Sequence, residues 1–108
     1  MTVESLTKTC GFEVVCMPSP EKKAEGAYIG DLLSWVMGKA ESGNVWITIM
    51  SNINVIAVAT LADVSCIVLA EGVTLSSEII ATAEAKGINV LSSPLSAYGI
   101  AKQISDIV

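Results

Sequence analysis

Short apolar runs alternate with helix-length segments along most of this sequence, and this alternation restricts the fold more than any other feature. The clearest runs are residues 45–50, 66–70 and 88–91. A strand that is apolar on both sides of its pleat is typical of a parallel sheet covered on both faces. Strands that alternate with helices of roughly 10–12 residues form consecutive βαβ units with right-handed crossovers. We therefore predict an α/β fold of three layers, with a mostly parallel sheet of four or five strands.

Turn and capping residues locate the remaining strands and the helices. Residues 12–17 form a strand that ends at Pro18, and residues 27–29 form a short strand that closes at Gly30. Capping residues predict one helix before the first strand and further helices between and after the later strands. The predicted helices run from Thr2 to Gly11, from Asp31 to Met37, from Ser51 or Asn52 to Ala62, from Ser76 or Ser77 to Gly87, and from Leu95 or Ser96 to the C-terminus.

Two of these helices carry more apolar surface than one small domain covers easily. The chain has 108 residues, the usual size of one domain, so we expect residues 1–108 to form a single α/β domain. The helix over residues 52–62 is apolar nearly all round, and residues 32–37 have two apolar faces, so we expect burial on more than one side. Part of this surface is expected to face another chain, most simply in a homodimer. The alternative is that the sheet and the neighbouring helices cover it.

The charged residues exclude several classes of function. Eleven acidic residues stand against six lysines, and arginine is absent, so we expect no nucleic-acid partner. Histidine is also absent, which removes the usual general base, the commonest zinc ligand and any Ser-His or Cys-His nucleophile pair. We therefore expect a protein that is not an enzyme and that has no catalytic residues, metal site or cofactor.

The cysteines and the N-terminus indicate a compartment. Cys10, Cys16 and Cys66 form neither an even disulfide framework nor a C-x-x-C pair, and we interpret them as small buried residues in a reducing environment. The N-terminus has no secretory signal. The apolar stretch over residues 45–70 is interrupted by several polar side chains, which a bilayer span of about 20 residues does not tolerate. We expect a cytoplasmic protein without a membrane partner.

Small polar residues gather where the predicted parallel strands end, which is where an open parallel sheet binds its ligand. Free N–H groups at helix N-termini favour anions at such positions. The same residues also serve as ordinary helix caps, and the two roles are compatible. We predict that a small anionic or nucleotide ligand binds here. The candidate ligand-binding residues are Gly30, Asp31, Ser51, Asn52, Asn54, Ser92 and Ser93.

Sequence motifs for phosphate chemistry are missing. The chain contains neither G-x-G-x-x-G nor G-x-x-x-x-G-K-[ST]. A phosphoryl-transfer enzyme needs such a loop together with metal-holding acids and cationic clamps. A phosphoryl- or acyl-transfer enzyme is therefore only a remote alternative.

Several segments resemble the DRTGG domain family in its small stand-alone form. The motif region resembles the family pattern with substitutions: Glu21 stands for Asp, Lys22 for Arg, Glu25 for Thr and Ala27 for the second Gly, while Gly26 matches. The motif residues carried over are thus Glu21, Lys22 and Gly26. The most specific likeness is residues 30–37, and it continues through residues 46–48, 54–59 and 91–98.

The resemblance implies a Rossmann-like α/β domain, similar to the N-terminal domain of HPr kinase/phosphorylase and to the module attached to CBS domains in regulated pyrophosphatases. It implies an accessory, dimer-forming or regulatory module without catalytic activity of its own. The stand-alone copies are often called serine kinases, but this chain has no match to the P-loop half of the kinase. A pure protein-interaction subunit of a larger metabolic or redox complex, with a metabolic enzyme as partner, is the alternative.

Overall fold

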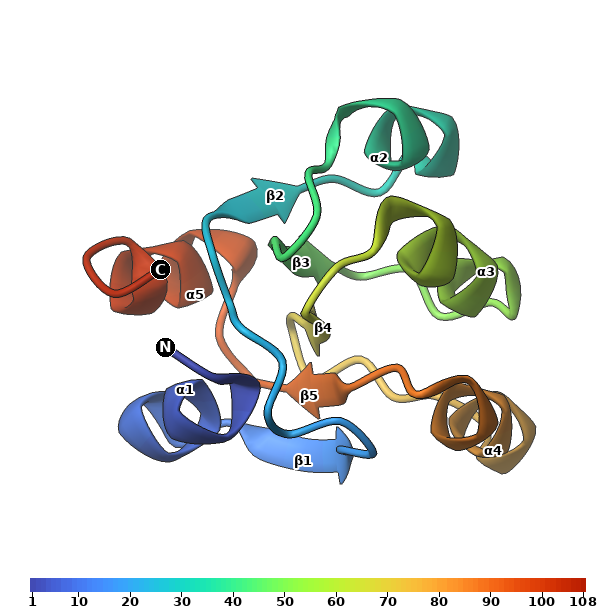
Figure 1. The fold of residues 1–108 in the computed structure, drawn as a ribbon, viewed down its shortest axis with the longest axis horizontal. Coiled ribbons are helices and arrows are strands. Elements are labelled where there is room, and N and C mark those ends of the chain that lie inside the picture. Colours follow the sequence, from blue (N-terminus) through green and yellow to red (C-terminus); the bar gives the residue numbers. More distant parts are fainter.

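Five helices cover both faces of a five-stranded sheet in the computed structural model, which describes all of residues 1–108 (Figure 1). The strand order is β1-β5-β4-β3-β2, with β2 to β5 parallel and β1 antiparallel to β5 at one edge. Helices α1 and α5 lie on one face and α2, α3 and α4 on the other. These findings confirm the three-layer α/β prediction. The elements are α1 Val3–Cys10, β1 Glu13–Cys16, β2 Ala27–Ile29, α2 Leu33–Lys39, β3 Val45–Thr48, α3 Asn54–Ala62, β4 Cys66–Leu69, α4 Ser77–Lys86, β5 Val90–Ser92 and α5 Ala97–Ile104.

The two central strands, β3 and β4, are buried along their whole length, as their unbroken apolar sequence predicts. Because successive side chains point to opposite faces, the strands supply two separate cores. Trp46 and Ile67 pack on the side of α2, α3 and α4. Ile47 and Val68 pack on the side of α1 and α5. Both faces of the sheet centre are thus closed, and only its edges and its two ends remain for function.

Helix ends with clear capping residues lie where the sequence predicts them. Thr2 caps α1, and Gly11 ends it in the left-handed conformation. Ser76 caps α4 by accepting the backbone N–H of Ile79, and Gly87 ends that helix with a φ of 73°. Helix α5 ends at Ile104 rather than at the C-terminus. None of the helices has the length and apolarity needed to cross a bilayer.

The prediction that Asp31 caps α2 is wrong. Helix α2 has Leu32 as its N-cap residue, without a side-chain hydrogen bond. The Asp31 carboxylate instead accepts hydrogen bonds from the hydroxyl of Thr48, at 2.8 Å, and from the backbone N–H of Ile49, at 3.0 Å. Because β2 and β3 pair in register and end side by side, the carboxylate reaches the neighbouring strand rather than its own helix.

The cap predicted for α3 is also placed differently. Ile53, rather than Ser51 or Asn52, is the N-cap residue, and it makes no side-chain hydrogen bond. Asn52 accepts the backbone N–H of Asn54 at 2.9 Å, so it forms a turn just before the helix.

In the single chain, helix α2 is buried on one side only, so its predicted burial on more than one side requires the second chain that the sequence also predicts. Val36 is its only buried residue, while Leu32, Trp35 and Met37 are exposed. The reason is its place in the layer: α2 lies beside the edge strand β2 at one end of the sheet, and α3 is the one helix beside it (Figure 1). The apolar face that points away from α3 therefore stays uncovered.

Candidate functional site

The predicted ligand-binding residues lie at the carboxyl ends of the parallel strands. Thr48 is in register with Leu69, and Leu69 with Ser92, so β3, β4 and β5 end together. Six of the candidates follow or end these strands and β2, and Asn54 begins α3. The seven are Gly30, Asp31, Ser51, Asn52, Asn54, Ser92 and Ser93.

Local hydrogen bonds engage several of these side chains. The Ser93 hydroxyl oxygen accepts a hydrogen bond from the backbone N–H of Leu95 at 3.1 Å. The Asn52 and Asp31 side chains accept the hydrogen bonds described above. Ser92 and Ser93 are buried, whereas Ser51 is exposed. The residues form no cavity together, and only Asn54 lines one, the groove between α3 and α4. Ligand binding at this edge stays a prediction.

A polar cavity of about 320 Å³ lies at the opposite, amino end of the parallel strands. Three loops enclose it: the loop before β2, the loop between α2 and β3, and the loop between α3 and β4. We call it the amino-edge pocket. Of the three motif residues, Lys22 lines this pocket and Gly26 lies next to its wall, while Glu21 does not line it. The lining residues are Lys22, Lys23, Glu25, Ser42, Gly43, Asp63, Val64 and Ser65.

Asn44 holds the three loops of the pocket together. Its side chain donates to the backbone oxygen of Glu25 at 2.9 Å and accepts from the backbone N–H of Glu41 at 2.9 Å. Its own backbone oxygen accepts the N–H of Ser65 at 2.9 Å and the Ser65 hydroxyl at 3.1 Å. Gly26 has a φ of 69°, and a Cβ there would lie 3.1 Å from the Asn44 amide nitrogen. The wall of the pocket is therefore fixed before any ligand arrives.

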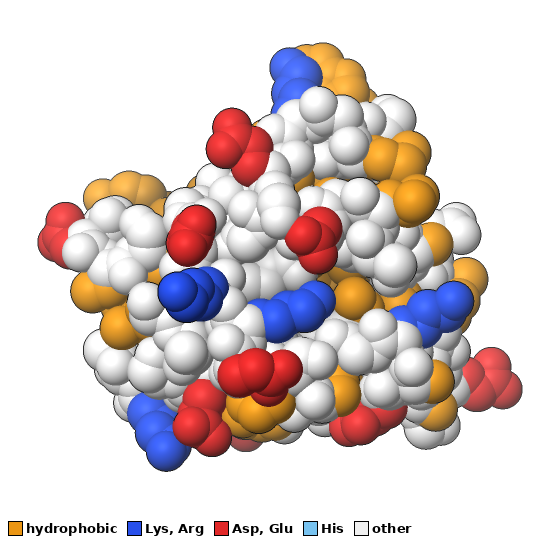
Figure 2. Space-filling view, viewed as in Figure 1, with side chains coloured by type: hydrophobic (Ala, Val, Ile, Leu, Met, Phe, Trp, Pro, Cys, Tyr) orange, Lys and Arg blue, Asp and Glu red, His pale blue; other side chains and the backbone are white.

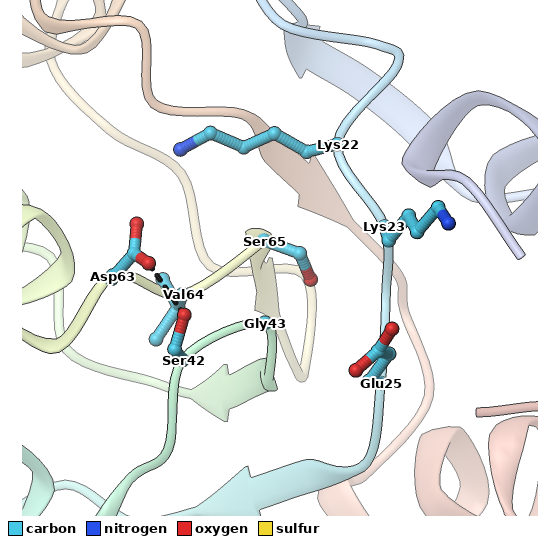
Figure 3. A pocket seen from close by; sticks show the side chains of 8 residues that line it. All are labelled: Lys22, Lys23, Glu25, Ser42, Gly43, Asp63, Val64 and Ser65. Carbon is cyan, nitrogen blue, oxygen red and sulfur yellow. Dashed lines mark hydrogen bonds between the residues drawn. The ribbon is translucent and has the colours of Figure 1, made fainter.

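The charged side chains that line the pocket point in different directions (Figure 3). The Lys22 side chain extends over the cavity toward the side of Asp63, whereas Lys23 turns away. The Asp63 carboxylate accepts a hydrogen bond from the Ser42 hydroxyl. In Figure 2, lysine and acidic side chains surround the recess on this face.

Sequence reasoning missed the pocket because its residues belong to distant loops. The one available signal was an aspartate where helix α3 ends.

Seven large apolar side chains, each exposed by 47–71%, surround the edge strand β2 and the helices next to it. Their elements are neighbours, since β2 pairs with β3 and α2 packs against α3. Figure 2 shows apolar side chains gathered over the side of α2 and α3. A groove of about 430 Å³ between α3 and α4 adjoins this region. We call the seven exposed side chains together the β2–α2–α3 surface. They are Ile29, Leu32, Trp35, Met37, Ile49, Ile53 and Leu61.

The three cysteines are free, and none has the properties of a reactive thiol. Burial raises the pKa of Cys66 from 9.0 to about 12. Burial also raises the pKa of Cys10, and burial together with the nearby Glu84 carboxylate raises that of Cys16. A thiolate, which is the nucleophilic form, is therefore disfavoured at all three positions.

The fold and the motif region together define a known class. The chain belongs to the DRTGG domain family, whose pattern matches residues 5–107. Among solved structures, the chain is similar to the CBS and DRTGG domains of the regulatory region of Clostridium perfringens pyrophosphatase, complexed with the activator diadenosine tetraphosphate. The TM-score is 0.73 at 18% identity, over 95% of this chain and 45% of that one. At this identity the likeness shows the fold alone. No curated protein matches the chain.

Proposed function

We propose that this chain is a non-catalytic regulatory or assembly module that works as a homodimer, paired through the β2–α2–α3 surface. The seven exposed apolar side chains carry this proposal. At about half exposure and about 200 Å² for a large side chain, they present roughly 700 Å². The largest apolar patch of a typical monomer is about 300–600 Å², and a standard interface covers about 800 Å² on each partner. The surface thus has the size that a dimer needs.

The two edges of the sheet favour a second copy at β2. An exposed edge strand is normally protected by charge, proline or a bulge. Strand β1 has all three, because it contains the exposed Glu13, has an irregular register between Val14 and Cys16, and is followed by Pro18. Strand β2 itself contains none, and the nearest charged residues, Glu25 and Asp31, lie two residues before and two residues after it. In a two-fold dimer, β2 meets its own copy antiparallel, which pairs the open backbone groups and covers the apolar side chains.

Two further features support a non-catalytic role in the cytoplasm. The chain has no histidine, and its thiols favour the protonated form, so the usual nucleophile–base pairs are not available. Three free cysteines fit a reducing compartment.

One matched pair of substitutions tests the dimer. Ile29 and Val14 are β-branched residues on the two opposite edge strands, exposed by 51% and 50%. In multi-angle light scattering we expect dimers for the unmodified chain and for Val14→Lys, and a folded monomer for Ile29→Lys. An Ile29→Lys protein that keeps its dimer contradicts the proposed interface. A monomeric unmodified chain also contradicts the homodimer. It would leave a partner enzyme as the occupant of this surface.

A nucleotide or small anion at the carboxyl ends of the strands is the second candidate function. Its support is the common end point of β3, β4 and β5, which brings Ser51, Asn52, Ser92 and Ser93 to one edge. The C. perfringens regulatory region provides a precedent, although this chain spans only 45% of it. Binding to the folded state raises stability, so a nucleotide that binds must raise the melting temperature. We expect that rise to disappear in Asn52→Ala if this edge is the site.

A further inference from the structure

We propose that the amino-edge pocket binds a small zwitterion, a molecule of amino-acid size with one ammonium group near Asp63 and one carboxylate near Lys22. The pocket lies at the opposite end of the strands from the predicted nucleotide site. The proposal does not depend on the homodimer.

Helix α3 ends differently from the two comparable helices of the same chain. Helices α1 and α4 each end at a left-handed glycine, Gly11 and Gly87, and each has a lysine in its last turn. Helix α3 ends at Asp63, which has a φ of 56°, and its last turn has no basic residue. The end of α3 thus departs from its neighbours both in backbone chemistry and in charge.

Both departures are unfavourable for folding. Glycine is the usual residue in the left-handed conformation at a helix end, and aspartate is one of the few other residues that adopt it, at a higher energy than glycine. A carboxylate also lies badly at the C-terminal, negative end of the helix dipole. Since the chain uses glycine at two equivalent positions, the backbone conformation alone does not require an aspartate there, and the Asp63 side chain instead accepts the Ser42 hydroxyl. Residues that break local rules in this way tend to serve a function.

The same carboxylate is well placed to attract a cation. It lies in the wall of the pocket, and the Ser42 hydroxyl orients it by donating a hydrogen bond. The negative end of the α3 dipole adds to its field. An ammonium group of a ligand pairs with the Asp63 carboxylate and with the negative end of the α3 dipole. It also supplies the positive charge that the last turn of α3 lacks.

Lys22 provides the opposite charge on the other side of the cavity. Its side chain extends over the pocket (Figure 3). Its backbone is fixed, because its N–H donates to the Ser19 oxygen at 3.3 Å and its own oxygen accepts the N–H of Val3 at 2.8 Å. The ammonium group therefore extends over the cavity from a fixed backbone, where a carboxylate can reach it.

Size and net charge select the class of ligand. A recess of about 320 Å³ lies at the lower end of the roughly 300–1,000 Å³ range of small-molecule sites, which suits a ligand of amino-acid size. The lining contains two lysines and two acids, and one of the lysines, Lys23, turns away, so the pocket has no surplus of positive charge. A polyphosphate would need a surplus of cations, whereas a zwitterion matches one charge of each sign. The wall built around Asn44 is pre-formed, which lowers the entropy cost of binding.

The test uses the full chain and calorimetric titration with the common L-amino acids, each at a concentration far above a plausible dissociation constant. For any amino acid that binds, the matched probes are the amine without its carboxylate and the acid without its amine. We expect the zwitterion to bind and raise the melting temperature, and both half-molecules to fail. If no amino acid binds, or if a half-molecule or MgCl2 binds as tightly, the proposal is overturned.

Three conservative variants locate the site. Asp63→Asn keeps the shape and tolerates the left-handed conformation, and Lys22→Gln keeps a polar side chain without the charge. We expect each to weaken binding about tenfold or more, as the loss of a charge-assisted hydrogen bond predicts. Lys23→Gln removes the lysine that turns away and should bind normally. Thermal unfolding confirms that each variant is folded. Unchanged binding by both Asp63→Asn and Lys22→Gln contradicts the assignment.

Discussion

The hydroxyl group of Thr48 donates a hydrogen bond to the carboxylate of Asp31, at 2.8 Å, and the same carboxylate oxygen accepts the backbone N–H of Ile49 at 3.0 Å. Thr48 ends β3 and Asp31 follows β2, so the contact ties the ends of the edge strand and its neighbour together. It also fixes Leu32 and Ile49, two members of the β2–α2–α3 surface, on either side of one carboxylate.

Replacing Asp31 by alanine should therefore destabilise the chain. Two hydrogen bonds to a charged but exposed group contribute about 1–2 kcal/mol together, and the substitution removes both. Urea unfolding measures the loss. Asp31→Asn keeps an acceptor oxygen and should lose clearly less. An Asp31→Ala protein as stable as the unmodified chain contradicts the structural role of this carboxylate.

The buried side chain of Asn89 should contribute more than any exposed asparagine. It donates to the backbone oxygens of Ser19, at 2.7 Å, and Ser65, at 3.0 Å, and accepts the N–H of Ser19 at 2.9 Å. Asn89→Ala leaves buried backbone groups without partners, and we expect a loss of about 3 kcal/mol in urea unfolding. Asn52→Ala is the control and should cost about 0.5 kcal/mol. Equal losses for the two variants contradict the account.

The sequence was sufficient for elements whose signal is local. Strands β3 and β4 were predictable because unbroken apolar runs have few alternatives in a small α/β chain. Helices α1 and α4 were predictable because a hydroxyl cap and a terminal glycine mark both ends. Strand β5 begins at Val90, two residues later than its predicted start at Ile88, although the backbone oxygen of Asn89 still accepts the N–H of Ile67 at 2.9 Å.

Features that depend on contacts between distant segments were not predictable. An aspartate before a helix looks the same whether it caps that helix or, like Asp31, bonds to a neighbouring strand. The apolar face of α2 indicates burial, but its exposure depends on where α2 lies in the layer. The amino-edge pocket joins residues 22–25, 42–43 and 63–65, which only the sheet topology brings together.

Stability should fall at high pH because of Cys66. Its pKa is raised from 9.0 to about 12 in the folded chain, so the folded state binds a proton that the unfolded state releases. The corresponding stability, about 4 kcal/mol, is present below pH 9 and is lost as the pH rises through about 12. Chemical unfolding across this range measures it. Cys66→Ala is the control, and its pH dependence should be flatter by this amount; parallel curves contradict the prediction.

Removing the charge of Asp63 should stabilise the fold even though we expect it to weaken ligand binding. Asp63→Asn takes a negative charge away from the C-terminal end of α3 and keeps the left-handed backbone. The expected gain is about 0.5 kcal/mol at low ionic strength, and salt should reduce it. Glu84→Gln, in the last turn of α4, is a control for the general effect of acids near a helix end. A loss of stability in Asp63→Asn indicates that the carboxylate serves the fold.

Sedimentation equilibrium of the unmodified chain over a range of micromolar concentrations tests the central claim most directly. The homodimer predicts a mass that rises with concentration to twice the 11.2 kDa of one chain. A mass that stays at 11.2 kDa throughout would contradict it.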